Sequence, residues 1–429
     1  MKMPPLQRYP VYKDSGVECL GSTPEGWEII RANYLFKIIN ERSKDGKEEL
    51  LTVSEHDGVR PRSECNVNMF MAESYKGYKI CYHDDLVINS LWAWSRGLGF
   101  SKYHGIVSTA YSVFRLSDNK CRSIFLNYLL RIKNYVDQYF ILSKGVWISR
   151  LQLSDWAFLR IPILIPPIPE QTAIASFLDE KCRKIDRSVA QKKKLVELLK
   201  ERKQIAIKNA VTKGLNPNSK MKDSGVEWIG EIPEHWEVMK CKYLFYETDE
   251  RSLEGKEELL SVSHITGVTP RSEKDVNMFL AENYAGSKLC QKGDLIYNIM
   301  WAWMGALGVS NQEGIVSPSY GVYRQKHHDN FNPSYLEKLL RSNKYIEHYN
   351  KVSTGLHSSR LRFYSHMFFS MKIGFPKKNE QDEIVVHIEK ESIKIDKAIT
   401  LQQKQIEKLK EYKATLINSA VTGKIKVVQ

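Results

Sequence analysis

The sequence lacks the marks of a membrane or secreted protein. No apolar run reaches the roughly 20 residues of a membrane span, and the N-terminal stretch MKMPPLQRYPVYKDSG has no apolar segment of the signal-peptide kind. Cysteine is sparse: the 7 residues, an odd number without a CxxC pair, suit a reducing compartment and argue against a structural zinc site. We therefore expect a cytoplasmic protein without a membrane association.

Catalytic signatures are missing as well. The sequence has no GxxxxGK[ST] phosphate loop, no GxGxxG after a strand, no HExxH and no His/Cys cluster at metal-ligand spacing. The stretch Asn332-Pro333-Ser334-Tyr335 is superficially similar to the Asn-Pro-Pro-aromatic motif of amino-methyltransferases. It lacks the second proline, however, and fits the start of a helix better. We expect a chain that is not an enzyme and that binds neither a metal nor a cofactor.

Internal repetition dominates what is present. The words SGVE and PExxWE occur near the start of both halves, and a constant offset of 209 residues carries Ser15 onto Ser224. The same offset carries LWAWSRGLG at 91–99 onto MWAWMGALG at 300–308. Later the offset becomes 210, as from Glu170-Gln171 to Glu380-Gln381. The chain is therefore a tandem duplication.

Each copy ends in a long amphipathic stretch. Apolar residues between Lys184 and Gly214 fall at alternating steps of four and three, with lysines in the polar slots, which is the spacing of a two-helix seam. The C-terminal stretch repeats this phase, and the two close on similar words, NAVTKG at 209–214 and NSAVTGK at 418–424. The seam positions are Ile185, Val189, Val196, Leu199 and Ala206, and then Ile395, Ile399, Ile406, Leu409 and Leu416. We expect two helices packed as an antiparallel coiled coil.

Shorter elements precede each long helix. Alternation predicts strands at Leu50–Ser54, Asp85–Asn89 and Tyr111–Leu116, followed by one helix that carries apolar residues from Phe125 to Phe140. The predicted fold class is α+β, with two similar domains and an approximate two-fold axis between them. The expected divisions are a first domain at 1–168, a spacer helix at 169–214, a second domain at 215–378 and a second spacer helix at 379–429.

A net charge of +14 and a pI near 9.2 favour a polyanionic partner. The loops of both domains are rich in side chains that bind phosphates and base edges. Candidate DNA contacts in the first domain are Arg60, Arg62, Asn89, Arg96, Lys102, Tyr103, His104, Lys144 and Arg150. Those in the second domain are Arg271, Asn298, Asn311, Ser353, Thr354, His357 and Arg360.

Structural explanations compete with DNA contact at several of these positions. Asn89 and Asn298 could cap turns, and Arg62 and Arg271, within the shared Pro-Arg-Ser, could form structural ion pairs. The tryptophans of the repeated WAW word fit a core position at least as well as a contact with bases.

The chain resembles the specificity subunit of a type I restriction-modification system. The resemblance rests on the SGVE and PExxWE openings, on the Glu-Gln pairs at 170–171 and 380–381, and on the Ala-Val-Thr helix ends, and it covers nearly the whole chain. The second copy departs from it in having Pro376-Lys377-Lys378-Asn379 before its Glu-Gln pair, in place of a proline-rich segment.

The resemblance implies that each domain reads one half of a bipartite double-stranded DNA site, with the helices as ruler and docking surface. It also implies partners: two modification subunits that use S-adenosylmethionine to methylate adenine, and restriction subunits that use ATP and Mg²⁺. Because the two domains are close copies, we expect related half-sites arranged as an inverted, interrupted repeat. Lengthening the Lys184 to Gly214 helix by one turn should then change the spacer alone.

Two other hypotheses remain open at this point. The chain could serve a methylase-only or a fused methylase-nuclease system, or it could be an interaction scaffold that recruits proteins through its coiled coil. Salt separates the scaffold from DNA binding, because DNA binding weakens steeply as the salt concentration rises.

Overall fold

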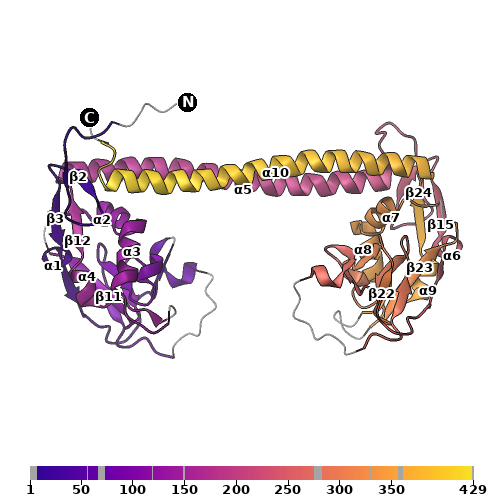
Figure 1. The fold of residues 1–429 in the computed structure, drawn as a ribbon, viewed down its shortest axis with the longest axis horizontal. Coiled ribbons are helices and arrows are strands. Elements are labelled where there is room, and N and C mark those ends of the chain that lie inside the picture. The colour runs from indigo at the N-terminus through magenta and orange to yellow at the C-terminus, as the bar shows by residue number, and fades with distance from the viewer. Residues whose placement is uncertain are drawn as a thin grey trace. The chain divides into compact units, whose positions relative to one another are not determined.

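The computed structural model of the chain describes residues 7–55, 57–65, 73–117, 119–147, 150–274, 283–327, 330–355 and 361–427 (Figure 1). It consists of two compact units, one formed by residues 1–193 with 404–429 and the other by residues 194–403. Each unit contains one β-rich domain and a part of each of two long helices, α5 (Ile168–Lys213) and α10 (Lys378–Val421). The fold class is α+β, as predicted.

Short strands and helices build the first domain. Its strands are β1 (Tyr12–Asp14), β2 (Ser22–Pro24), β3 (Glu28–Arg31), β4 (Phe36–Ile39), β5 (Leu51–Ser54), β6 (Gly58–Pro61), β7 (Lys79–Cys81), β8 (Leu86–Asn89), β9 (Leu98–Phe100), β10 (Gly105–Val107), β11 (Tyr111–Leu116) and β12 (Pro162–Ile165). Its helices are α1 (Ala32–Leu35), η1 (Arg62–Glu64), η2 (Ala93–Ser95), α2 (Ser123–Leu129), α3 (Lys133–Leu142) and α4 (Asp155–Leu159).

The second domain repeats this order of elements. Its strands are β13 (Met221–Asp223), β14 (Glu231–Pro233), β15 (Glu237–Lys240), β16 (Phe245–Glu247), β17 (Leu260–Ser263), β18 (Gly267–Pro270), β19 (Lys288–Cys290), β20 (Leu295–Asn298), β21 (Leu307–Val309), β22 (Gly314–Val316), β23 (Tyr320–Gln325) and β24 (Lys372–Phe375). Its helices are α6 (Cys241–Leu244), η4 (Arg271–Glu273), η5 (Ala302–Met304), α7 (Pro333–Leu340), α8 (Asn343–Val352) and α9 (Ser365–Ser370).

An antiparallel four-stranded sheet is the centre of each domain. The strand order is β4-β11-β8-β9 in the first and β16-β23-β20-β21 in the second. The register is also the same: Val113 faces Val87 and, 209 residues later, Val322 faces Ile296. The predicted strands are present as β5, β8 and β11, each within one residue of the expected bounds. The repeat in sequence is therefore a repeat in topology.

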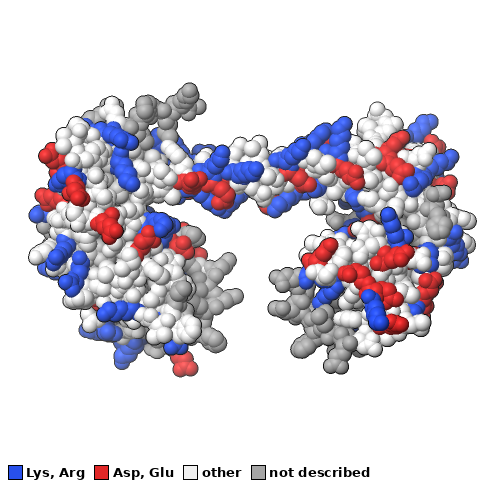
Figure 2. Space-filling view, in the orientation of Figure 1, with Lys and Arg blue, Asp and Glu red and all other residues white. Residues whose placement is uncertain are grey.

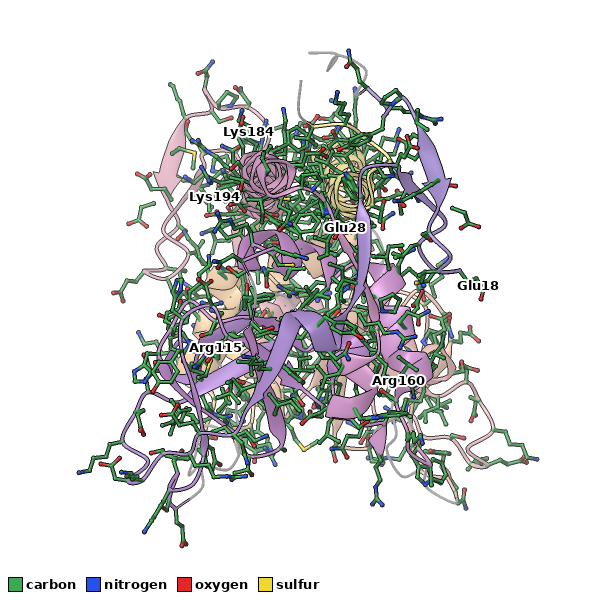
Figure 3. All side chains as sticks on the ribbon, turned by 90° about the vertical axis from the view of Figure 1, so that its left-hand side faces the viewer. Glu18, Glu28, Arg115, Arg160, Lys184 and Lys194 are labelled. Atoms are coloured by element: carbon green, nitrogen blue, oxygen red, sulfur yellow. The ribbon has the colours of Figure 1, made fainter. Side chains whose placement is uncertain are left out.

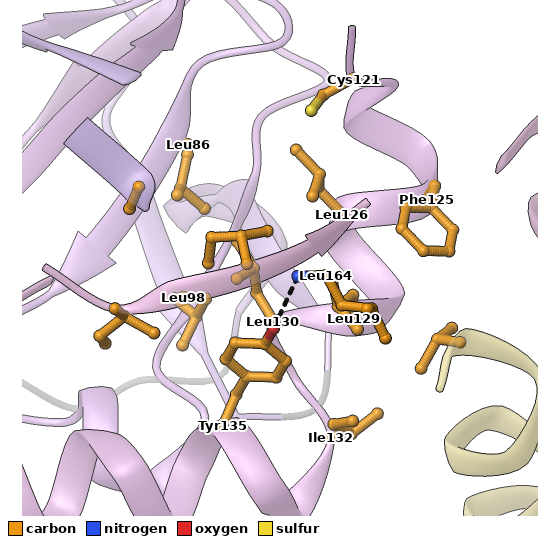
Figure 4. Close-up of a cluster of buried hydrophobic side chains, with 14 of the residues drawn as sticks. Leu86, Leu98, Cys121, Phe125, Leu126, Leu129, Leu130, Ile132, Tyr135 and Leu164 are labelled. Atoms are coloured by element: carbon orange, nitrogen blue, oxygen red, sulfur yellow. Dashed lines mark hydrogen bonds between the residues drawn. The ribbon is translucent and has the colours of Figure 1, made fainter. Parts of the chain in front are cut away.

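The main core of each domain lies between this sheet and helices α2 and α3, or α7 and α8. In the first domain Leu86 and Leu98 of the sheet contribute to the same buried cluster as Phe125 and Leu129 of α2 (Figure 4). Tyr135 of α3 is fully buried, and its hydroxyl accepts a hydrogen bond from the Leu164 amide at 3.1 Å. Each such side chain contributes about 1.5–3 kcal/mol by leaving water.

The structure has two helices, α2 and α3, where the sequence predicted one. The expected helix from Phe125 to Phe140 is interrupted after Leu129, and α3 starts at Lys133 behind an extended residue, Ile132. The hydroxyl of the buried Tyr139 donates to the Leu130 carbonyl at 2.9 Å, which satisfies a group that the break exposes. Tyr349 and Leu340 repeat this bond at 2.8 Å in the second domain. The apolar periodicity continues across the break, so the sequence pattern did not reveal it.

The repeated sequence words meet where each domain joins its long helix. In the first unit the Trp27 indole N–H donates to the Glu170 carboxylate at 3.0 Å, and the Tyr9 hydroxyl donates to the same oxygen at 2.7 Å. In the second unit Trp236 donates to Glu380 at 3.1 Å. In each unit the tryptophan of the PExxWE motif thus binds the glutamate of the Glu-Gln pair at the helix start.

The glutamine of each Glu-Gln pair is fully buried and bonds only to backbone. The Gln171 amide donates to the carbonyls of Lys120 and Pro166, both at 2.8 Å, and its oxygen accepts from the Arg122 N–H at 2.8 Å. Gln381 makes the same three contacts, with Asn330, Pro376 and Asn332, at 2.9 Å each. One side chain therefore fixes the helix start against two separate segments of its domain.

The Ala-Val-Thr helix ends reach the same tryptophans. At the end of α10, Ala420 and Val421 join the first domain's core, and the Tyr12 hydroxyl donates to the Gly423 carbonyl at 2.9 Å. Gly423 has φ +72°, and a Cβ there would lie 2.4 Å from Pro24. In the second unit the end of α5 lies against Trp236, again through a left-handed glycine, Gly214. Each domain therefore holds the start of its own helix and the end of the other.

The two long helices run antiparallel within each unit. In the first, Lys413 pairs with Asp186 at 2.7 Å and Lys192 bonds to Gln405, so residue numbers rise along one helix and fall along the other. In the second, Lys203 pairs with Asp396 at 2.7 Å. All ten expected seam residues are buried or half-buried, whereas Leu198 and Ile205 are 50 % exposed. No helix within the described residues has the length and apolarity needed to cross a membrane.

Replacing Gln171 by leucine should selectively loosen the first unit. The substitution leaves two carbonyls and one N–H buried without partners, so we expect the free energy of opening to fall by about 2–4 kcal/mol. Hydrogen exchange of the β3 and β12 amides measures that free energy. The β15 and β24 amides of the second unit should be unaffected.

Thr172→Val is the matched control, because Thr172 is exposed and its hydroxyl bonds only within the helix at Ile168. It should change stability by less than about 0.5 kcal/mol. Equal protection of β3 and β12 in both variants would show that Gln171 does not anchor the helix.

Candidate nucleic-acid interface

The candidate DNA contacts lie at opposite ends of the central sheet. Strand β8 ends at Asn89, which is followed by η2 and Arg96. At its other end the Ser101 amide donates to the Asp85 carbonyl and the Asp84 amide donates to the Ser101 carbonyl, both at 2.8 Å, and residues 102–104 follow there. The second domain has the same division, with Asn298 at one end and Asn311, next to the Asp294–Ser310 pair, at the other. The candidates therefore do not form one surface.

Three segments of the first domain meet at the Asn89 end. The Leu153 amide donates to the Ser90 carbonyl at 3.0 Å, which joins the loop after α3 to the loop after β8. The Ser95 hydroxyl lies 3.4 Å from the Glu55 carboxylate, at the tip of the β5–β6 hairpin. In the second domain Phe363 and Ile299 repeat the first of these contacts at 3.0 Å. Asn89, Arg96, Lys144 and Arg150 belong to these segments, and Arg62 follows β6 at the start of η1.

Arg62 and Arg271 each lie near a tyrosine of the same end. Burial raises the pKa of Tyr111, and the hydrogen bond from Thr52 and the positive charge of Arg62 lower it. Burial also raises the pKa of Tyr320, and Arg271 lowers it. Neither arginine forms an ion pair with the described residues. Their positive charges are therefore not neutralised by an acidic partner within that part of the chain.

Several other candidates have structural roles. Arg60 pairs with Asp57 at 2.9 Å and with Glu64 at 3.4 Å. Asn89 is 8 % exposed and its oxygen accepts from the Leu91 amide at 3.3 Å. Asn298 caps the Met300 amide at 3.2 Å and also donates to the Tyr320 hydroxyl at 3.1 Å. Both asparagines therefore cap turns in the free chain, as the structural alternative predicted.

The loop after α3 is closed by a short bridge. Lys144 and Gln152 exchange backbone hydrogen bonds at 3.1 and 3.0 Å, and Thr354 and Arg362 do so at 3.1 and 2.9 Å. The side chains of Lys144, Arg150 and Thr354 are exposed, while Ser353 is half-buried. His357 and Arg360 lie outside the described residues.

The opposite end contains the remaining candidates. Lys102 and Asn311 are exposed, and Tyr103 packs against a small core of the sheet. His104 stacks on Tyr82 with ring centroids 4.8 Å apart. The Arg115 guanidinium also lies over the Tyr82 ring, 5.0 Å from its centroid.

An exposed aromatic pair marks the Asn89 end in both domains, and we did not include it among the candidates. Trp92 stacks on Trp94 with centroids 5.6 Å apart, and Trp301 stacks on Trp303 at 5.9 Å. Trp92 is 53 % exposed and Trp301 is 44 % exposed, so these two rings do not belong to the core. The WAW word that both copies share was the available signal.

Two repeated arginines are structural. Arg115, visible below helix α5 in Figure 3, binds the buried Asp85 carboxylate through two nitrogens at 2.7 and 2.8 Å. Arg324 binds Asp294 in the same way at 2.8 and 2.9 Å. Each acid raises the pKa of its arginine. These cations are therefore already neutralised.

Surface charge is mixed on the face seen in Figure 2, where acidic and basic side chains alternate over both β-rich domains. Among the residues that the structure describes, no group of three or more His, Cys, Asp or Glu side chains could hold a metal ion. All 7 cysteines are free thiols. The geometry suits binding through cations, amides and aromatic rings.

Residues 24–198 match a family described as the type I restriction modification DNA specificity domain. The chain is 24 % identical to the type I restriction enzyme MjaVIII specificity subunit of Methanocaldococcus jannaschii, over 94 % of each chain. A shorter region, 30 % of this chain and 28 % of the relative, is 32 % identical to the putative MjaX specificity subunit of the same organism.

Solved structures share the fold. A chain studied for complex assembly and conformational transition of the type I R-M system is similar with a TM-score of 0.66 and 14 % identity, over 93 % of this chain and 98 % of that one. The HsdS subunit from Thermoanaerobacter tengcongensis gives a TM-score of 0.54 and 16 % identity, over 94 % and 98 %. The comparisons thus show a type I restriction modification DNA specificity domain at residues 24–198, similarity along nearly the whole chain to a type I specificity subunit, and a fold shared with these solved structures.

Proposed function

We propose that this chain is a DNA specificity subunit that acts in the cytoplasm. It binds a bipartite double-stranded DNA target and directs partner subunits to it. Residues 1–168 and 215–378 are the target-recognition domains, and residues 169–214 and 379–429 are the spacer helices. The observation that carries the proposal is the repeated sheet, which offers the same loops at the same positions in both domains.

The duplication also constrains the target. Both domains present an arginine of the Pro-Arg-Ser word and an exposed tryptophan at the same end of the sheet, Arg62 with Trp92 and Arg271 with Trp301. Similar side chains at matched positions select similar bases. We therefore infer related half-sites in inverted orientation, which differ where the loops differ, as at Lys102 and Asn311.

Chemistry belongs to other subunits in this proposal. The chain is the non-catalytic member of the complex and binds no cofactor. Two modification subunits use S-adenosylmethionine to methylate adenine at N6, and restriction subunits use ATP and Mg²⁺. Extrusion of the target adenine from the duplex would be their task.

Mapping N6-methyladenine tests the central proposal. Cells that express this chain with its modification subunits should carry methyladenine in a two-part motif with a fixed gap, and the two halves should be related by inversion. Cells with the modification subunits alone are the control. A motif with unrelated halves would refute the duplicated-site argument, and the absence of any new motif with an active modification subunit would refute the specificity role.

Lengthening both helices should change the gap alone. Four residues inserted after Lys193 and four after Gln403 add about 6 Å, at ~1.5 Å per residue, which corresponds to roughly two base pairs at about 3.4 Å each. The same methylation map should show unchanged half-sites with a longer gap. Four residues inserted instead between Asn216 and Asn218, outside the helix, should leave the gap as it was. A changed half-site would contradict the ruler role.

An exposed apolar stripe on α5 supports docking of a modification subunit. Leu195, Leu198 and Ile205 are 41 %, 50 % and 50 % exposed, and their spacing puts them on one helix face. Leu198→Glu should weaken binding of the modification subunit by about tenfold or more, measured by titration calorimetry, because a charge would enter the apolar contact.

Leu253→Glu is the matched control, since Leu253 lies in a loop of the second domain and is 92 % exposed. The two variants should unfold at the same temperature as the original chain. Equal affinity of both variants for the modification subunit would place the docking surface elsewhere.

A further inference from the structure

The turn after η2 contains an unusual backbone conformation in one copy only. Arg96 has φ +62° and ψ +21°, in the left-handed region, whereas its counterpart Gly305 has φ +84°. Among the described residues, only Asp84 and Arg96 combine a side chain with positive φ. The second domain has glycine at both places, Gly293 and Gly305. The first domain therefore keeps two conformations that glycine adopts without steric cost.

The two positions differ in what offsets this cost. Asp84 has a short polar side chain of the kind that tolerates the left-handed region, and it accepts a hydrogen bond from the Ser123 hydroxyl at 2.6 Å. Arg96 is half-buried, and within the described residues its guanidinium makes no ion pair and no hydrogen bond. A strained residue whose charge has no partner within the described residues indicates a function in a complex.

The neighbouring helix has changed in a way that accommodates Arg96. A Cβ built at Gly305 would lie 2.8 Å from the Ile346 Cδ1 atom of α8. The corresponding residue of α3 in the first domain is Val136, which lacks that methyl group. The first domain thus has room for a side chain where the second domain has filled the space.

The local charge has also changed. In the second domain Glu337 pairs with Arg341 at 2.8 Å, and its other oxygen accepts from the Val309 amide at 3.0 Å. The first domain has Asn127 in place of Glu337, and Asn127 accepts the equivalent bond from Phe100 at 3.2 Å. The acid at this position of the helix is therefore missing, although its backbone contact is kept.

The arginine of this pair is retained as Arg131, which donates to the Glu55 carbonyl at 2.5 Å. Burial lowers the pKa of Arg131, and the positive charge of Arg96 lowers it further, while Asp57 and Glu55 act in the opposite sense. The geometry agrees, since Arg131 bonds to the Glu55 backbone and Ser95, next to Arg96, bonds to the Glu55 side chain at 3.4 Å, so both cations lie near Glu55 and repel each other. An anion between or beside them would relieve that repulsion.

We propose that Arg96, supported by Arg131, binds a backbone phosphate of the DNA half-site read by the first domain, and that the second domain lacks this contact. The inference rests on the proposed function, because the anion is part of a DNA duplex. A phosphate fits better than a base edge, since two neighbouring cations match a full negative charge. The two half-sites are then bound unequally even where their sequences are alike.

Three substitutions of Arg96 in the full chain, assembled with its modification subunits, test the proposal. The probe is a duplex that carries the methylated motif, titrated over a range of salt concentrations. Arg96→Gly should lower affinity about tenfold and reduce the slope of log K against log salt by about 1, with an unchanged or higher melting temperature because the strain is removed. Arg96→Ala should lose the same affinity without that thermal gain.

Arg96→Lys separates a phosphate from a guanine contact. A lysine keeps the charge and should retain most of the salt slope, whereas the bidentate geometry that guanine requires would be lost. Asp84→Gly is the control for backbone change in the same domain, and its salt slope should equal that of the original chain.

The outcomes distinguish this inference from the function on which it rests. If the original chain binds with a steep salt dependence and Arg96→Gly binds equally well, the phosphate site is wrong and the DNA-binding function stands. A loss confined to one base pair of the motif, with an unchanged slope, would replace the phosphate by a base contact. If the original chain does not bind the duplex, both proposals fail.

Discussion

The hydrogen bonds at the first turn of each long helix hold the architecture together. Gln171 and Gln381 are fully buried, and each joins three backbone groups from two segments of its domain. Glu170 and Glu380 hold the tryptophan against which the end of the other helix packs. An isolated amphipathic helix gains little stability from its own sequence, so its order depends on tertiary contacts at its ends and seam. Buried polar networks of this kind stabilise a structure only when every member is satisfied, as these glutamines are.

The large features of the fold could be predicted because they are periodic or repeated. The offset of 209 residues revealed the duplication, and the heptad-like spacing predicted the helix pair, since both signals extend over many residues. The break between α2 and α3 could not be predicted, because Tyr139 bonds to Leu130 only in three dimensions and the apolar spacing continues across it. The structural role of the Glu-Gln pair could not be predicted either, since Glu170 bonds to Trp27, which is 143 residues away in the sequence.

The interface was harder to predict than the fold, because residue type does not say whether a cation is already paired. Arg115 and Arg62 look alike in sequence, yet the partner of Arg115, Asp85, is 30 residues away along the chain and directly opposite in the sheet. Asn89 and Lys102 are similarly plausible as contacts, although they lie at opposite ends of β8 and β9. A net charge of +14 therefore overstates the number of cations that are available to a polyanion.

The duplication provides a comparison that a single domain would not. Contacts present in both copies, such as Arg115–Asp85 and Arg324–Asp294, belong to the shared framework. The two domains differ at matched positions, such as Arg96 and Gly305 or Asn127 and Glu337, although their sheets have the same strand order and register. A framework fixed by the helix-start network can therefore tolerate loop changes without a change of fold. Because Arg96 is strained and its guanidinium makes no ion pair or hydrogen bond within the described residues, this difference raises the free energy of the unbound domain, and an anionic ligand bound by the guanidinium would supply a contact that the free domain lacks.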